Sequence, residues 1–216
     1  MNYKLVLFDL DGTLLNTIAD LREAVNHAMA LRAYPQYTLD ECTQMVGHGV
    51  RNLIYQALPA SVRDDATAVD AALADFTDYY TAHIDVHTRP YPGIQDLVSE
   101  LHRHGILMAI ASNKFQAGTE HLVNEFFPGI PFVAVLGNRP GYPLKPDPEI
   151  VGEVLRKAGI GKEKAVMIGD SPTDMKTAAN GGIKGIAVGW GYRNMKGIEG
   201  LTVVDSVEEL HRLLLP

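Results

Sequence analysis

LVLFDLDGTLLNT (residues 5–17) begins as a run of apolar, strand-forming residues and changes abruptly at Asp9, which is followed by Asp11, Gly12 and Thr13. A short apolar run without polar alternation is typical of a strand buried on both faces of a parallel sheet. In open sheets of this kind, ligands bind outside the carboxyl ends of the strands. The stretch therefore predicts a strand that delivers two carboxylates to a site, where Gly12 lets the backbone approach a ligand closely.

The rest of the chain alternates strand-like and helical patterns. GIQDLVSELHRHG (residues 93–105), for example, places its large apolar residues on one helical face. This alternation predicts right-handed crossovers, and hence an α/β fold with a Rossmann-like, mostly parallel sheet and helices on both faces. The further predicted strands are residues 106–111, 132–136, 165–169 and 185–189.

The alternation is interrupted between Asn16 and about Asp85, where only helical patterns are found. Thr17, three residues before Asp20, predicts an N-cap pair for the first of these helices. An all-helical insert directly after the first strand predicts a cap over the end of that strand, and TRPYPG (residues 88–93) indicates the return to the sheet. The predicted domains are a Rossmann-like core of residues 1–15 and 88–216 and a helical cap of residues 16–87.

Charge and composition limit the classes of partner. The chain has 216 residues and a formal net charge of −7, which disfavours nucleic acids and anionic membranes as partners. It contains no apolar run of membrane-spanning length and no N-terminal signal segment. Cys42 is the only cysteine, so a reducing, cytoplasmic location is expected. Both a monomer and a homodimer are compatible with the sequence.

Polar residues also follow the other predicted strands. Ser112 and Asn113 end the second strand, the third leads into a loop that carries Lys145, and Asp170 ends the fourth. Because the carboxyl ends of parallel strands meet at one edge, these groups should gather there with the two carboxylates of the first strand.

The charges of that predicted site require a further cation. Three carboxylates with Lys145 as the only counter-charge would repel one another, since two unit charges about 4 Å apart interact by about 4 kcal/mol at an effective dielectric of about 20. A divalent cation resolves the conflict, and ligands that are all oxygen favour Mg²⁺. No histidine or cysteine lies in these segments, so zinc is not expected.

Four segments in order, DLDGTLLNT, ASNK, KPDP and GDSPTD, resemble the motifs of the haloacid dehalogenase superfamily. The resemblance spans nearly the whole chain, and the helical insert is similar to the small helical cap of that superfamily. It implies a Mg²⁺-dependent phosphatase that forms an aspartyl-phosphate intermediate. It also implies roles for individual residues. Asp9 is the expected nucleophile and Asp11 the expected acid and base. Thr13, Ser112 and Lys145 are expected to hold the phosphoryl group, with Gly12 and Asn113 as substrate-binding residues. The expected metal ligands are Asp9, Asp11 (through its backbone carbonyl), Asp170 and Asp174.

Details of the motifs narrow the chemistry that the resemblance implies. Dehalogenases of the superfamily lack the second aspartate, which is present here as Asp11, and the hexose-phosphate mutase branch has valine where Thr13 stands. GWGYR (residues 189–193) and VGHGVRNLI (residues 46–54) look like phosphoglycolate phosphatase relatives. The expected substrate is a small phosphorylated metabolite. The alternatives are a phosphosugar mutase, a phosphonate hydrolase, or a non-catalytic binding relative.

Several site residues have a plain structural interpretation as well. Asp9 and Asp11 could be turn carboxylates, Ser112 could cap a helix that starts near Phe115, and Asp174 could complement a helix dipole.

Arg51 is the predicted substrate-binding residue of the helical insert. Residues 16–85 contain four arginines, ten acidic residues and no lysine, so a phosphorylated substrate approaching them needs an inward cation. Arg51 follows the turn GHG, in the first turn of a predicted helix, and its guanidinium could bind a substrate oxyanion. The alternative is an exposed helix arginine.

Overall fold

The computed structural model describes residues 3–215 and divides into two compact units. Unit 1 comprises Met1–Asn16 and Pro90–Pro216, and unit 2 comprises Thr17–Arg89. The two connections between the units run through β2 (Leu15–Asn16) and β3 (Arg89–Pro90), which pair as a separate two-stranded sheet.

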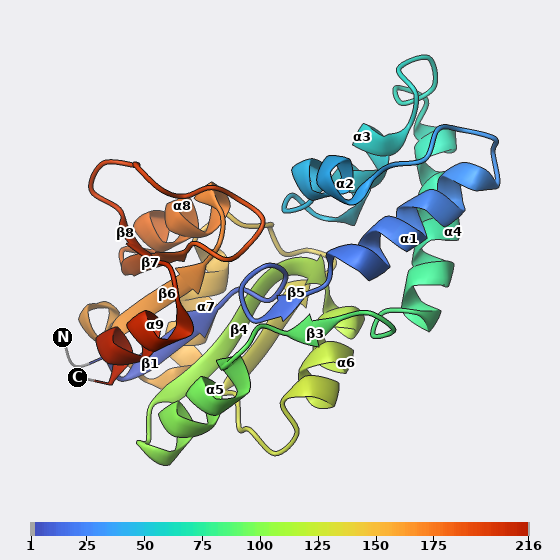
Figure 1. The fold of residues 1–216 in the computed structure, drawn as a ribbon. Helices are drawn as coiled ribbons and strands as arrows, with labels where there is room; N and C mark the ends of the chain where they lie inside the picture. The colour runs from blue at the N-terminus through green and yellow to red at the C-terminus, as the bar shows by residue number, and fades with distance from the viewer. Residues whose placement is uncertain (1–2, 216) are drawn as a thin grey trace. The chain divides into compact units, whose positions relative to one another are not determined.

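Unit 1 is built on a six-stranded sheet in the order β5-β4-β1-β6-β7-β8, in which every neighbouring pair is parallel (Figure 1). The predicted mostly parallel α/β fold is therefore confirmed, and the strand order puts the opening stretch at the centre of the sheet. Parallel neighbours on both sides explain its unbroken apolar character. The strands are β1 (Leu5–Phe8), β4 (Leu107–Phe115), β5 (Ala134–Asn138), β6 (Ala165–Gly169), β7 (Lys184–Val188) and β8 (Thr202–Val204).

Helices pack against this sheet through amphipathic faces. On one face, Leu5 and Leu7 of β1 join a buried cluster with Val151 and Val154 of α7. Val6 and Phe8, which point the opposite way, are also fully buried, as expected for a central strand with helices on both faces. The helices of unit 1 are α5 (Ile94–Arg103), α6 (Gln116–Phe126), α7 (Glu149–Ala158), α8 (Pro172–Gly181) and α9 (Val207–Leu214), with a 3₁₀ turn at Lys162–Lys164.

Two features of unit 1 differ from the sequence-based expectations. β4 continues to Phe115 instead of ending near Ala111, because its pairing with β5 resumes after a register shift. β8 and α9 were not predicted. β8 has only three residues, too few to show a strand pattern.

Unit 2 is helical, as predicted, with α1 (Ile18–Ala30), α2 (Leu39–Met45), α3 (Val50–Ala57) and α4 (Ala66–Ala82). The predicted Thr17–Asp20 cap is wrong, because the Thr17 side chain makes no cap hydrogen bond. The buried Asp20 carboxylate instead accepts hydrogen bonds from the backbone N–H groups of His87 and Thr88 and from the Thr88 hydroxyl. Asp20 thus ties the end of unit 2 to its first helix. Within the described residues, no helix has the length and apolar character needed to cross a membrane.

Candidate active site

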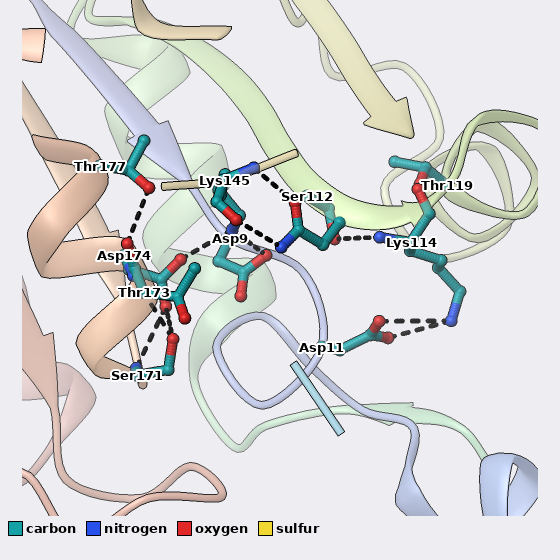
Figure 2. A network of polar contacts seen from close by, with 11 residues as sticks. Asp9, Asp11, Ser112, Lys114, Thr119, Lys145, Ser171, Thr173, Asp174 and Thr177 are labelled. Atoms are coloured by element: carbon teal, nitrogen blue, oxygen red, sulfur yellow. Dashed lines mark hydrogen bonds and ion pairs between the residues drawn. The ribbon is translucent and has the colours of Figure 1, made fainter. Parts of the chain in front are cut away.

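Asp9 directly follows β1 and lies at the centre of the candidate site (Figure 2). Its backbone N–H donates to Ile168 O of the neighbouring β6 at 2.9 Å, and only 8% of the residue is exposed. Burial, and after it the negative charge of Asp174, raise the pKa of Asp9 to about 7 despite the opposing charge of Lys145. Lys145 alone therefore does not compensate for the burial of the ionised Asp9 carboxylate and the charge of its acidic neighbour.

Asp170 and Asp174 complete an acidic cluster with Asp9. One carboxylate oxygen of each lies within 4.8 Å of the others. Burial, followed by the charges of Asp174 and Asp9, raises the pKa of Asp170 to about 8, although its Oδ2 accepts a hydrogen bond from the backbone N–H of Tyr192 at 2.6 Å. The sheet thus brings the ends of β1 and β6 together, as the strand-end rule predicted.

Lys145 provides a cation on the same side of the site. Its Nζ lies 2.7 Å from Asp174 Oδ1 and 2.9 Å from Asp9 Oδ1, and its side chain is 2% exposed. Burial alone would lower the pKa of Lys145, but the two carboxylates outweigh that effect and raise it above its ordinary value. The backbone of Lys145 is held by Asn113, whose amide group accepts from Lys145 N at 2.8 Å and donates to Lys145 O at 3.1 Å. In this structure Asn113 thus orients the lysine; its substrate-binding role stays a prediction.

Asp174 lies at the start of α8, where its structural interpretation placed it, and it also contacts the site lysine. Its Oδ2 accepts hydrogen bonds from the backbone N–H and the hydroxyl of Ser171, which forms a capping box at the start of α8. Its Oδ1 binds Lys145. It is therefore a helix-capping residue and a partner of the site lysine at once.

Ser112 does not cap the following helix, because the N-cap position of α6 is Phe115. It is 3% exposed, and its Oγ accepts a hydrogen bond from Lys114 N at 3.2 Å. Thr13 is fully buried, and its Oγ1 has no hydrogen-bond partner within the described residues. Its backbone carbonyl accepts from Trp190 Nε1 at 3.1 Å. An unpartnered buried hydroxyl at this position is available for a bound oxyanion.

Glycine is required at two positions that enclose Asp170. Gly12 has φ +83°, and a Cβ placed there would lie 2.4 Å from Asp170 Oδ2. A Cβ at Gly191 would lie 2.2 Å from Asp170 Cβ and 2.4 Å from Gly12 O. The segments around Gly12 and Gly191 therefore close on Asp170 from two sides, which explains the second glycine of GWGYR by packing.

The expectation that Lys145 would be the only counter-charge is wrong, because Lys114 is also buried at the site. Its Nζ lies 3.1 Å from Asp11 Oδ1, and its side chain is 1% exposed. The Asp11 carboxylate points toward this lysine, on the side of Asp9 away from Asp174 (Figure 2). A lysine directly behind Ser112 and Asn113 in an otherwise uncharged strand was the sequence signal for this role.

The residues present fit a divalent cation. Four carboxylates face two ammonium groups, which leaves an excess of two negative charges before any substrate binds. Asp9 Oδ1 is buried and, although close to Lys145 Nζ, makes no hydrogen bond of acceptable geometry. A carboxylate cluster with an unsatisfied buried oxygen and no nitrogen or sulfur donor suits Mg²⁺. The groups counted are Asp9, Asp11, Asp170 and Asp174 against Lys114 and Lys145.

Arg51 belongs to unit 2, in the first turn of α3 as predicted. Its Nη1 lies 2.5 Å from Asp70 Oδ1, and the two side chains are 56% and 64% exposed. Arg51 is therefore an exposed arginine with an acidic partner on α4.

Comparison with known proteins places this chemistry in a family. Residues 6–188 match the family model of haloacid dehalogenase-like hydrolases. A phosphoglycolate phosphatase of Mesorhizobium japonicum is 36% identical over 97% of this chain and 94% of the relative. Phosphoglycolate phosphatase 1 of Pseudomonas aeruginosa is 33% identical over 96% of this chain and 78% of the relative. The chain belongs to the haloacid dehalogenase-like hydrolase family, as its motifs indicated.

Solved structures agree with this assignment. A candidate phosphoglycolate phosphatase from Lactobacillus delbrueckii subsp. bulgaricus superimposes with a TM-score of 0.92 at 33% identity, over 99% of both chains. CbbY from Rhodobacter sphaeroides, solved in complex with phosphate, superimposes with a TM-score of 0.77 at 26% identity, over 96% of both chains. Within its family, the protein is a phosphatase.

Proposed function

We propose that the protein is a Mg²⁺-dependent phosphatase that hydrolyses phosphoglycolate, or a closely similar small metabolite, through an aspartyl-phosphate on Asp9. The observation that carries the proposal is the buried Asp9 carboxylate, 2.9 Å from Lys145 Nζ and clustered with Asp170 and Asp174. Relatives that bear the name phosphoglycolate phosphatase over nearly the full chain support the substrate class.

Two displacements at phosphorus make up the reaction. In the first, a carboxylate oxygen of Asp9 forms a bond to phosphorus while the bond to the ester oxygen breaks, and Asp11 gives that oxygen a proton. In the second, a water attacks the same phosphorus, Asp11 takes the proton of the water, and the bond between phosphorus and Asp9 breaks. Inorganic phosphate and the alcohol are the products, and both aspartates return to their starting states.

The other site residues stabilise the transferring phosphoryl group. Lys145 supplies a buried positive charge, and the hydroxyls of Thr13 and Ser112 donate hydrogen bonds to the oxygens of the phosphoryl group. The Gly12 backbone approaches the group from the side of the turn. Asp9, Asp170 and the backbone carbonyl of Asp11 would hold Mg²⁺, with Asp174 in support, and the ion would supply the positive charge that lets a phosphate dianion approach a carboxylate.

Unit 2 is proposed to act as the cap that limits the substrate to small molecules. Its helical composition and its insertion directly after the first strand support this role. Arg51 is the residue of this unit proposed to bind the non-reacting end of the substrate, for which it would have to exchange its partner Asp70 for the substrate.

A turnover screen tests the proposal. Phosphate release would be measured for phosphoglycolate, a panel of sugar phosphates and p-nitrophenyl phosphate, with Mg²⁺ and with EDTA. We expect the highest kcat/KM for phosphoglycolate and loss of all turnover in EDTA. A sugar phosphate as the best substrate, or full activity in EDTA, would contradict the substrate or the metal dependence respectively.

A further inference from the structure

Lys114 has no part in the proposed transfer of the phosphoryl group, yet it is buried at the site. Its Nζ lies 3.1 Å from Asp11 Oδ1 and 3.4 Å from Asp11 Oδ2, and its side chain is 1% exposed. Lysines are rarely buried to this extent, since removing an ammonium group from water is costly. The desolvation cost of burying Lys114 beside Asp11, the proposed acid for the leaving group, indicates that this lysine has a function in the site.

The local structure of β4 directs Lys114 toward Asp11. The pairing of β4 with β5 shifts register between Ala111 and Phe115, and irregularities of this kind re-aim side chains beside active sites. The backbone of Lys114 is fixed on both sides: its N–H donates to Ser112 Oγ at 3.2 Å, and its carbonyl accepts from Thr119 Oγ1 at 3.3 Å. The register shift and the two hydrogen bonds to its backbone thus fix the position from which the Lys114 side chain reaches Asp11.

The two lysines of the site lie on opposite sides of Asp9 (Figure 2). Lys145 lies between Asp9 and Asp174, at 2.9 and 2.7 Å, where the phosphoryl group is to be transferred. Lys114 lies beside Asp11, which must contact the ester oxygen in order to protonate it. Lys145 therefore faces the phosphoryl half of a substrate, and Lys114 faces its leaving group.

Distances define the part of the leaving group that Lys114 can reach. Two hydrogen bonds in series, from Nζ to Asp11 and from Asp11 to the ester oxygen, place Nζ within about 6 Å of that oxygen. In phosphoglycolate a single methylene separates the ester oxygen from the carboxylate. A carboxylate at this position can reach Nζ, whereas a charge several carbons further away would extend past it.

We propose that Lys114 determines substrate specificity by binding a carboxylate on the carbon next to the ester oxygen, so that the enzyme selects 2-phosphooxy carboxylates. This inference rests on the proposed function. It assigns binding of the substrate carboxylate to Lys114 of unit 1, in addition to the contact proposed for Arg51 of unit 2. A hydrogen bond between a buried ammonium and a carboxylate is strong and geometrically selective. Esters that lack the carboxylate leave that interaction unmade and are discriminated against.

The test compares two substrates that share the phosphate, the ester oxygen and the methylene carbon. Phosphoglycolate and ethyl phosphate differ in having a carboxylate or a methyl group at the same position, so the ratio of their kcat/KM values measures recognition of the carboxylate. Lys114→Gln keeps a hydrogen-bond donor for Asp11 and removes the charge. Lys114→Met serves as a second variant should the first fail to fold. Lys184→Gln, at an exposed lysine at the start of β7, is the matched control.

We expect the wild-type enzyme to prefer phosphoglycolate, and Lys114→Gln to reduce that preference by about 10- to 100-fold, the value of one hydrogen bond to a charged group. Inhibition by the product glycolate should weaken in parallel, a change that a role confined to orienting Asp11 would not cause. A wild-type enzyme without the preference would overturn the proposed substrate together with this inference. A wild-type preference that both folded variants retain would overturn the inference alone, and would make Lys114 a partner of Asp11 only.

Discussion

Lys114 in unit 1 and Arg51 in unit 2 are both cations paired with an aspartate, and they differ in environment. The Lys114 side chain is 1% exposed and rests in the sheet, whereas the Arg51 side chain and its partner Asp70 are each more than half exposed on helices. An exposed ion pair contributes about 0–1 kcal/mol and can exchange partners at little cost. A buried charge that loses its partner is strongly destabilising. The charges at the strand ends of unit 1 are therefore held more firmly than the exposed pair of unit 2.

The reason lies in how the two units hold their charges. In unit 1 the site residues follow the ends of adjacent parallel strands, so backbone hydrogen bonds such as that of Asp9 N to Ile168 O position the side chains. In unit 2, Arg51 and Asp70 lie exposed on two helices. Exposed long side chains keep the freedom to change rotamer that burial would remove. Four substitutions, from the largest expected effect to the smallest, test this difference.

Asp9→Asn should abolish phosphatase turnover, because an amide cannot form the acyl-phosphate bond. The change is nearly isosteric and removes a charge from a crowded acidic cluster, so the thermal unfolding midpoint should not fall. Phosphate release and a melting curve would be measured beside Asp96→Asn, at an exposed position of α5. Turnover near the wild-type value would exclude covalent catalysis through Asp9.

Lys145→Met should lower kcat/KM by about 10²-fold or more, since it removes the buried charge that we propose stabilises the transition state. The loss should be similar for phosphoglycolate and p-nitrophenyl phosphate, because both present the same phosphoryl group. Lys157→Met provides the control, as the Lys157 side chain is 49% exposed in its ion pair with Glu153. If Lys145→Met lowered kcat/KM no more than Lys157→Met, a buried lysine would not contribute more to activity than an exposed one.

Asp170→Asn should raise the Mg²⁺ concentration needed for half-maximal activity, because the cluster loses one of its few anionic ligands. Activity would be titrated with Mg²⁺ and compared with Asp205→Asn, which removes an exposed partner of Lys196. Overlapping titration curves for Asp170→Asn and the wild type would remove Asp170 from the metal ligands.

Arg51→Ala should have the smallest effect, a rise in KM of a few fold for the native substrate with p-nitrophenyl phosphate hydrolysis nearly unchanged. The measurement is a pair of KM values, with Asp70→Asn as control because it frees Arg51 and keeps its charge. Equal changes for both substrates, or none for either, would leave selectivity to another residue. A KM effect as large as that of a Lys114 variant would break the comparison between the two units.

Much of the fold of unit 1 could be predicted because short segments of the sequence identify its strands. Continuous apolar runs identify central parallel strands, and the residue after each run must lie at the carboxyl edge of the sheet. The sequence therefore predicted that Asp9, Ser112 and Asp170 lie at one edge, and the structure places Asp9 and Asp170 in one acidic cluster. Family motifs added Thr13 and Asp174, for which strand periodicity carries no signal. β8, with three residues, was below the length at which a pattern is visible.

The sequence by itself determined the fold class, the helical insert and the gathering of carboxylates, because these follow from periodicity along a single segment. Only the tertiary structure decided which groups pair. The irregular end of β4 turns Lys114 to Asp11, the Asn113 amide holds the Lys145 backbone, and Asp20 binds the far end of unit 2. Each pair joins residues more than 30 positions apart. Such partners are chosen by packing and by the cost of leaving a buried polar group unpaired, and neither is written in the local pattern of a chain.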